Sequence, residues 1–146
     1  MDLSLGSNYA VQQVFGGVLD PYALPEKLYT FHSMPVNLLP VDGLLFSSEE
    51  WVVMPEDSWG FVQIRSTFAR LGLICPPTIV DPGFKGNITL EIMNNSYNTI
   101  HLREGDRVCS LILVPVYSSF PPEIYNGRYQ NQKGVTPPKS LVKEIS

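Results

Sequence analysis

The chain has 146 residues, of which 44% are hydrophobic and 16% charged, and its formal net charge is −4 with a sequence pI of about 5.0. This length suits one domain with a single core, the apolar content excludes a disordered chain, and no apolar run is long enough to span a membrane. The acidic balance argues against nucleic-acid binding, and the low charged fraction indicates either a large subunit interface or a sticky surface.

Short apolar runs separated by turn signals follow one another along most of the chain. The first six residues, Met1 to Gly6, contain no basic leader followed by an apolar stretch, so we expect a cytoplasmic protein. The clearest runs have strand length, and several alternate apolar with polar residues. They cover residues 51–54, 60–64, 87–93 and 108–114. Many short strands with regular turns predict an all-β sandwich or barrel.

One segment predicts a helix, and the end of the chain predicts an arm. Residues 66–72 begin with hydroxyl side chains that can cap a helix and end on Gly72, which suits one or two turns. The segment 127–146 holds little apolar material before Leu141, which is typical of an arm that becomes ordered on binding. We therefore expect a single domain at residues 1–126 and a C-terminal arm at 127–146.

The sequence gives little support for a disulfide, or for catalysis or metal binding by cysteine or histidine. Cys75 and Cys109 lie far apart in sequence, and two buried reduced thiols are favoured over a disulfide. Zinc-dependent cytidine deaminases need a Cys-x-x-Cys pair and an H-x-E motif, both of which are absent, while His32 and His101 are isolated. A Walker loop and a dinucleotide glycine fingerprint are also missing. We expect no zinc.

The densest group of polar residues lies between residues 64 and 91. Arg65, Ser66 and Thr67 place a guanidinium and two hydroxyls at the expected helix start, where free N–H groups attract anions. Arg70 follows Ser66 by one turn on the same face. A plain helix cap and a solvated arginine are the alternatives. The turn at residues 80–86 adds a carboxylate and an aromatic ring.

Glu91 stands in the middle of an otherwise apolar strand, Ile88 to Ile92. A buried glutamate is costly unless paired, and burial raises its pKa towards the value that a general base needs. An exposed glutamate on an alternating strand is equally consistent with the pattern.

Four ordered segments together resemble the dCTP deaminase branch of the dUTPase superfamily. Two of them are Arg65 to Leu73 and Val80 to Glu91. Met1 to Gly6 is similar to the early V-D-L-x-L-G motif, and Gly127 to Thr136 is similar to the C-terminal Y-Q-x-Q-x-G-x-T motif. The chain begins at the first motif, where deaminases carry a further helix. Its loop 71–80 is shorter than in common bacterial members and lacks their histidine.

The resemblance implies a distorted jelly roll or β-barrel of the dUTPase-like type with one short helix, assembled as a homotrimer with active sites between subunits. It implies a dCTP or dUTP ligand, and Mg²⁺ that accompanies the triphosphate rather than a cage of protein ligands. The implied reaction converts dCTP and water to dUTP and ammonia, and some members continue to dUMP and diphosphate.

By the same resemblance Glu91 is the general base on water, while Ser66 and Arg70 hold the base and stabilise charge. The turn that receives deoxyribose matches Asp81 and Phe84. The implied contacts to phosphate and to the arm are Arg65, Thr67, Arg128, Tyr129 and Gln132.

Two other functions stay open at this point. The first is a dUTP diphosphatase only, in which Asp81 activates water for attack on the α-phosphate. The second is a non-catalytic regulatory trimer that keeps the nucleotide pocket. The combination of Ser66, Arg70 and Glu91 favours deamination over both.

Overall fold

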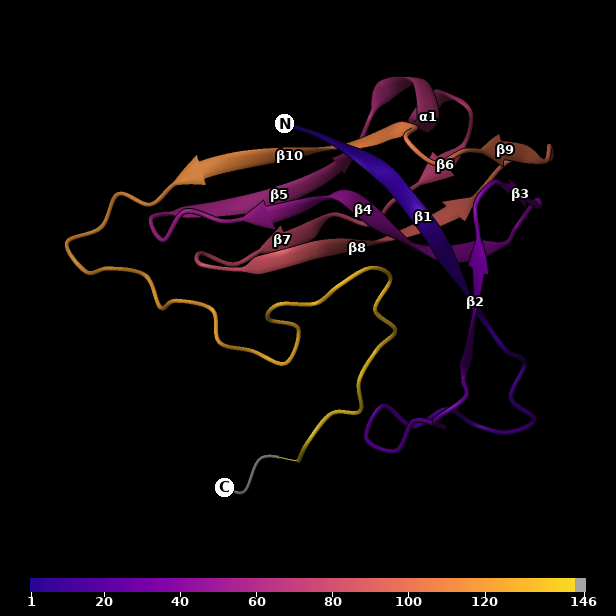
Figure 1. Ribbon diagram of the computed structural model, residues 1–146, viewed down its shortest axis with the longest axis horizontal. Helices are drawn as coiled ribbons and strands as arrows, with labels where there is room; N and C mark the ends of the chain where they lie inside the picture. The colour runs from indigo at the N-terminus through magenta and orange to yellow at the C-terminus, as the bar shows by residue number, and fades with distance from the viewer. Residues whose placement is uncertain (144–146) are drawn as a thin grey trace.

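An eight-stranded sheet forms most of the computed structural model, which describes residues 1–143 (Figure 1). Its strands are β1 (Asp2–Gln12), β2 (Tyr29–Ser33), β4 (Gly43–Val53), β5 (Ser58–Ile64), β6 (Leu73–Ile74), β7 (Thr78–Val80), β8 (Lys85–Asn94) and β10 (Arg107–Pro115). The other elements are a two-stranded sheet of β3 (Val36–Leu38) and β9 (Ile100–Leu102) and one helix, α1 (Ser66–Arg70). The predicted all-β class with one short helix is confirmed.

The strands pair antiparallel in the order β6-β8-β4-β1-β10-β5-β7, with β2 added to β1. Strand β1 joins the two halves, because its first residues pair with β10 and its later residues pair with β2 and β4. The register shifts between Leu3 and Ser4 of β1, and again between Ser47 and Trp51 of β4. Such irregularities bend strands and increase twist, which lets one sheet curl around its own apolar face.

One apolar core lies inside the curled sheet. Leu3, Phe46 and Val62, from three different strands, have no exposed surface. The buried and exposed residues alternate along β8, as expected when a strand covers a core with one face only. The buried residues of β8 are Gly86, Ile88, Leu90, Ile92 and Asn94, so the residues between them face the other way.

Helix α1 is a single exposed stretch between β5 and β6, with none of its residues buried. Arg65 precedes it in extended conformation, and no side chain caps its start, so the predicted hydroxyl cap is wrong. The predicted end is confirmed, since Gly72 takes a φ of +99° that L side chains rarely adopt. A Cβ at Gly72 would also lie 2.8 Å from that of Ser96, so glycine is required there.

The chain leaves β10 and returns beneath the sheet, so that its C-terminal part runs beside β8 (Figure 1). Asn131 N donates to Lys85 O at 2.8 Å, and Asn87 N donates to Gln132 O at 3.0 Å. These bonds pair the segment in parallel with the start of β8. Of the expected arm 127–146, residues 144–146 lie outside the described part.

Cys75 and Cys109 are both buried and both free, which confirms the prediction of two buried thiols over a disulfide. Across residues 1–143, no helix is long and apolar enough to cross a membrane.

Candidate functional site

A cavity of about 440 Å³ lies between β8, the turn that precedes it and the arm. Five of the residues singled out in the sequence line it. They are Asp81, Phe84, Glu91, Tyr129 and Gln132. Residues far apart in sequence therefore meet in one concave site with carboxylates, an aromatic ring and an amide, which is the composition of a small-molecule pocket.

Glu91 lies on the face of β8 that is opposite the core, across from Leu45 of β4. Its side chain is exposed in the single chain, as the alternating-strand interpretation predicted. The cavity wall nevertheless removes part of its water, and this desolvation raises the pKa of the Glu91 carboxyl, against a smaller opposing effect of a backbone hydrogen bond. A carboxylate in such a wall is suited to accept a proton.

The turn between β7 and β8 places a carboxylate and a ring at one end of the cavity. Phe84 N donates to Asp81 O at 3.1 Å, which closes the turn. Between them Gly83 has a φ of +78°, and a Cβ there would lie 2.5 Å from a methyl carbon of Ile124. The Phe84 side chain is buried, and its ring packs at 5.8 Å from that of Tyr125. Burial and the contact with Tyr125 therefore hold this ring in place.

The polar residues of α1 lie elsewhere. Arg65, Ser66, Thr67 and Arg70 are all exposed, and none of them lines the cavity. In Figure 1 the helix lies above the sheet, whereas the arm lies below it. Within one chain, the structure thus does not bring Ser66 and Arg70 to Glu91.

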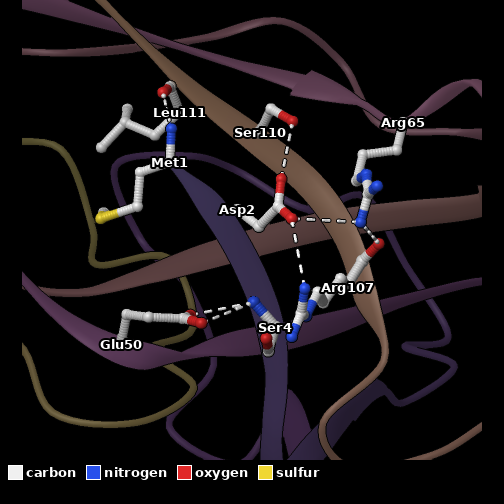
Figure 2. A network of polar contacts seen from close by, with 8 residues as sticks. All are labelled: Met1, Asp2, Ser4, Glu50, Arg65, Arg107, Ser110 and Leu111. Carbon is white, nitrogen blue, oxygen red and sulfur yellow. Dashed lines mark hydrogen bonds and ion pairs between the residues drawn. The ribbon is translucent and has the colours of Figure 1, made fainter.

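The side chain of Arg65 is held at the start of β1, as Figure 2 shows. Its Nη1 atom lies 3.3 Å from Oδ2 of Asp2 and donates to the carbonyl oxygen of Arg107 at 3.4 Å. The other oxygen of Asp2 accepts from Ser110 Oγ at 3.4 Å. Asp2 lies in the segment that resembles the V-D-L-x-L-G motif. Its contact with Arg65 was not predicted from the sequence. The pairing of β1 with β10 creates this contact.

The arm contributes Tyr129 and Gln132 to the cavity but turns Arg128 away from it. The Arg128 guanidinium is exposed and donates from Nη1 to Ser140 O at 2.9 Å. Two further residues, Tyr125 just before the arm and Gln130 within it, contact the β7–β8 turn and were missed in the sequence. Gln130 lies inside the C-terminal motif, which is the one signal that could have identified it.

Within residues 1–143, no three His, Cys, Asp or Glu side chains come together closely enough to hold a metal ion.

Comparisons with known proteins agree on one family. A family model described as dCTP deaminase-like matches residues 1–116. The dCTP deaminase of Pyrobaculum islandicum is 43% identical over 144 residues, which cover 97% of this chain and 80% of that protein. The dCTP deaminase of Sulfurisphaera tokodaii is 48% identical over 140 residues, which cover 95% and 75%.

Two solved structures show the same fold. The 2′-deoxycytidine 5′-triphosphate deaminase of Agrobacterium tumefaciens superposes with a TM-score of 0.62 and 21% identity over 77% of this chain and 36% of that one. The dUTPase of Staphylococcus aureus phage phi11 gives a TM-score of 0.53 and 21% identity over 64% and 79%. The family model and the relatives that match nearly the whole of this chain show that it belongs to the dCTP deaminase-like family.

Proposed function

We propose that the protein is a dCTP deaminase, which converts dCTP and water to dUTP and ammonia. The observation that carries this proposal is the cavity, where Glu91, Asp81 and Phe84 lie together beneath the arm in a chain so similar to named dCTP deaminases. The Glu91 carboxylate accepts a proton from water, whose oxygen attacks C4 of cytosine, and passes protons to the amino group that leaves as ammonia. The raised pKa of Glu91 supports both transfers.

The same proposal assigns Ser66 and Arg70 to the site of a neighbouring subunit. Both are exposed at one end of their own chain, where they are free to meet the cavity of another copy. Strand β10 offers a surface for such assembly, because Ile112, Leu113 and Val114 are 50%, 48% and 44% exposed although a strand points successive side chains to opposite faces. A homotrimer, with a mass three times 16.3 kDa, is the assembly that we propose.

The triphosphate of the substrate would contact cationic and polar groups from two regions. One comprises Arg65 and Thr67 beside the start of α1. The other is the arm, with Arg128, Tyr129 and Gln132. We assign residues 1–126 to the barrel domain and 127–146 to the arm that closes over the site. Magnesium bound to the phosphates would neutralise their charge and fix their geometry. The phi11 dUTPase structure describes the coordination of a structural Mg(II) ion, so one protein of this fold binds that cation.

The cytoplasmic location expected from the sequence belongs to this proposal. Two buried cysteines that remain free are typical of a protein in a reducing compartment.

A second candidate, dUTP diphosphatase activity, is favoured by one feature of the same cavity. Asp81 reaches its wall beside Phe84, and a carboxylate there could activate water for attack on the α-phosphate of dUTP. The fold is shared with the phage dUTPase, but the relatives that match nearly the whole chain are named dCTP deaminases.

Incubation of the purified protein with dCTP and, separately, with dUTP distinguishes these activities. Each reaction contains magnesium, and a parallel reaction contains EDTA. Ammonia together with dUTP or dUMP from dCTP is the expected result. Diphosphate from dUTP without ammonia from dCTP would favour the second candidate, and nucleotide binding without turnover of either would contradict both. Sedimentation equilibrium tests the trimer independently.

A further inference from the structure

We propose that Gln130 is a positioning residue that fastens the arm to the turn beneath the sugar, an inference that rests on the proposed function of this cavity. Its side-chain amide makes three hydrogen bonds. Oε1 accepts from Lys85 N at 2.7 Å, and Nε2 donates to the carbonyl oxygens of Gly83 at 3.0 Å and Tyr125 at 3.1 Å. One arm side chain therefore binds the main chain immediately before and immediately after Phe84.

A glutamine side chain suits this position because the site needs a donor and an acceptor on the same planar group. Its NH₂ group has two donors, both of which are used, and its oxygen satisfies an amide N–H that is otherwise without a ladder partner at the start of β8. A carboxylate would retain the acceptor but present negative charge to two carbonyl oxygens. An apolar side chain of similar length would leave all three main-chain groups unpaired.

The position of Gln130 links two walls of the cavity. Its neighbours Tyr129 and Gln132 line the cavity from the arm, while Phe84 lines it from the turn. Tyr125 strengthens the same link, because its ring packs on Phe84 and its hydroxyl accepts from Tyr129 N at 3.1 Å. The three hydrogen bonds of Gln130, which we call the clip, thus fix the position of the arm residues relative to the β7–β8 turn. Preorganisation of this kind lowers the cost of binding.

The test compares Gln130→Glu, Gln130→Met and the control Lys133→Gln, an exposed arm residue, in the full-length protein. Hydrogen–deuterium exchange of residues 127–136 without nucleotide reports whether the arm is docked. We expect exchange about tenfold faster than wild type in both Gln130 variants, since each loses at least two hydrogen bonds, and unchanged exchange in the control.

Steady-state kinetics with dCTP gives the second measurement. We expect KM to rise about tenfold in both Gln130 variants, while kcat at saturation stays close to wild type because bound substrate still holds the arm.

Wild-type exchange and wild-type KM in both Gln130 variants would overturn the inference. If wild-type protein leaves dCTP unchanged while exchange of the arm still accelerates in the variants, the proposed function fails and the clip stands.

Discussion

Replacement of Glu91 by glutamine separates catalysis from stability at the centre of the proposed site. The variant keeps the size of the side chain but removes the proton acceptor, and proton transfer by a positioned side chain contributes about 10²- to 10⁴-fold to rates. We therefore expect kcat for dCTP deamination to fall at least about 100-fold. The affinity for nucleotide and the assembly state should stay close to wild type, because Glu91 covers no core residue.

The expected effect on stability has the opposite sign to that on activity. Desolvation raises the pKa of Glu91 in the folded protein, so the native state binds this proton more tightly than the unfolded state. The charged form consequently costs stability above the folded pKa, and this cost disappears as the pH falls below 4.5, the ordinary pKa of a glutamate. Since the side chain is largely exposed in the single chain, we expect a gain of no more than about 1 kcal/mol for Glu91→Gln at neutral pH, or about 2–4 °C in Tm.

Thermal unfolding at neutral pH and near pH 4, alongside ammonia release from dCTP, measures both effects. Glu104→Gln, which changes an exposed glutamate in the turn before β10, is the matched control and should leave both quantities unchanged. Full deaminase activity in Glu91→Gln would remove this residue from the mechanism. A Tm several degrees below wild type at neutral pH would show instead that Glu91 makes stabilising contacts, and would refute the sign derived from desolvation.

Three further substitutions test other parts of the molecule. Asp81→Asn should reduce any dUTP cleavage far more than deamination, and an unchanged rate of diphosphate release would contradict its assigned role. Arg128→Ala should weaken triphosphate binding in calorimetry by about tenfold with little change in kcat. The reason is that the guanidinium is exposed and a charged hydrogen bond is worth about 1.5–3 kcal/mol. Unchanged affinity would count against an arm contact. Phe46→Ala should destabilise the fold by about 3–5 kcal/mol in urea unfolding, because its ring has no exposed surface, and a smaller loss would indicate a core that collapses around the gap.

The strand pattern in the sequence identified the local parts of this fold. The runs at 60–64, 87–93 and 108–114 fall within β5, β8 and β10, since alternation and β-branched residues decide which segments become strands. The run at 51–54 marks only the end of β4, which begins at Gly43. Strand β1 was recognised as a family motif and not as a strand, because Asp2 to Gln12 mixes polar and small residues whose partners lie far along the chain.

The assembly of the site depends on contacts that no local pattern contains. Leu45 and Tyr125 line the cavity because of β4–β8 pairing and the return of the arm, respectively. The motifs could name Asp81, Phe84 and Glu91, but their common cavity requires the turn, the strand and the arm to meet. The motifs therefore identify residues of the site, whereas strand pairing and the return of the arm bring those residues together.

Glu91 shows why burial could not be settled from composition alone. Its apolar neighbours Leu90 and Ile92 suggested a buried strand glutamate. Successive side chains of a strand point to opposite faces, however, so Leu90 and Ile92 point to the core and Glu91 points away from it. That face would be open to water in a simple sheet, but here the arm and the β7–β8 turn cover it and create the cavity. We infer that this second layer of chain over the outer face of β8 contributes to the desolvation that raises the pKa of the Glu91 carboxyl. Loosening the arm in Gln130→Met should therefore lower the pKa of Glu91 towards its ordinary value and shift the acidic limb of the kcat/KM profile to lower pH. An unshifted limb would show that the strands of the sheet alone desolvate the carboxyl.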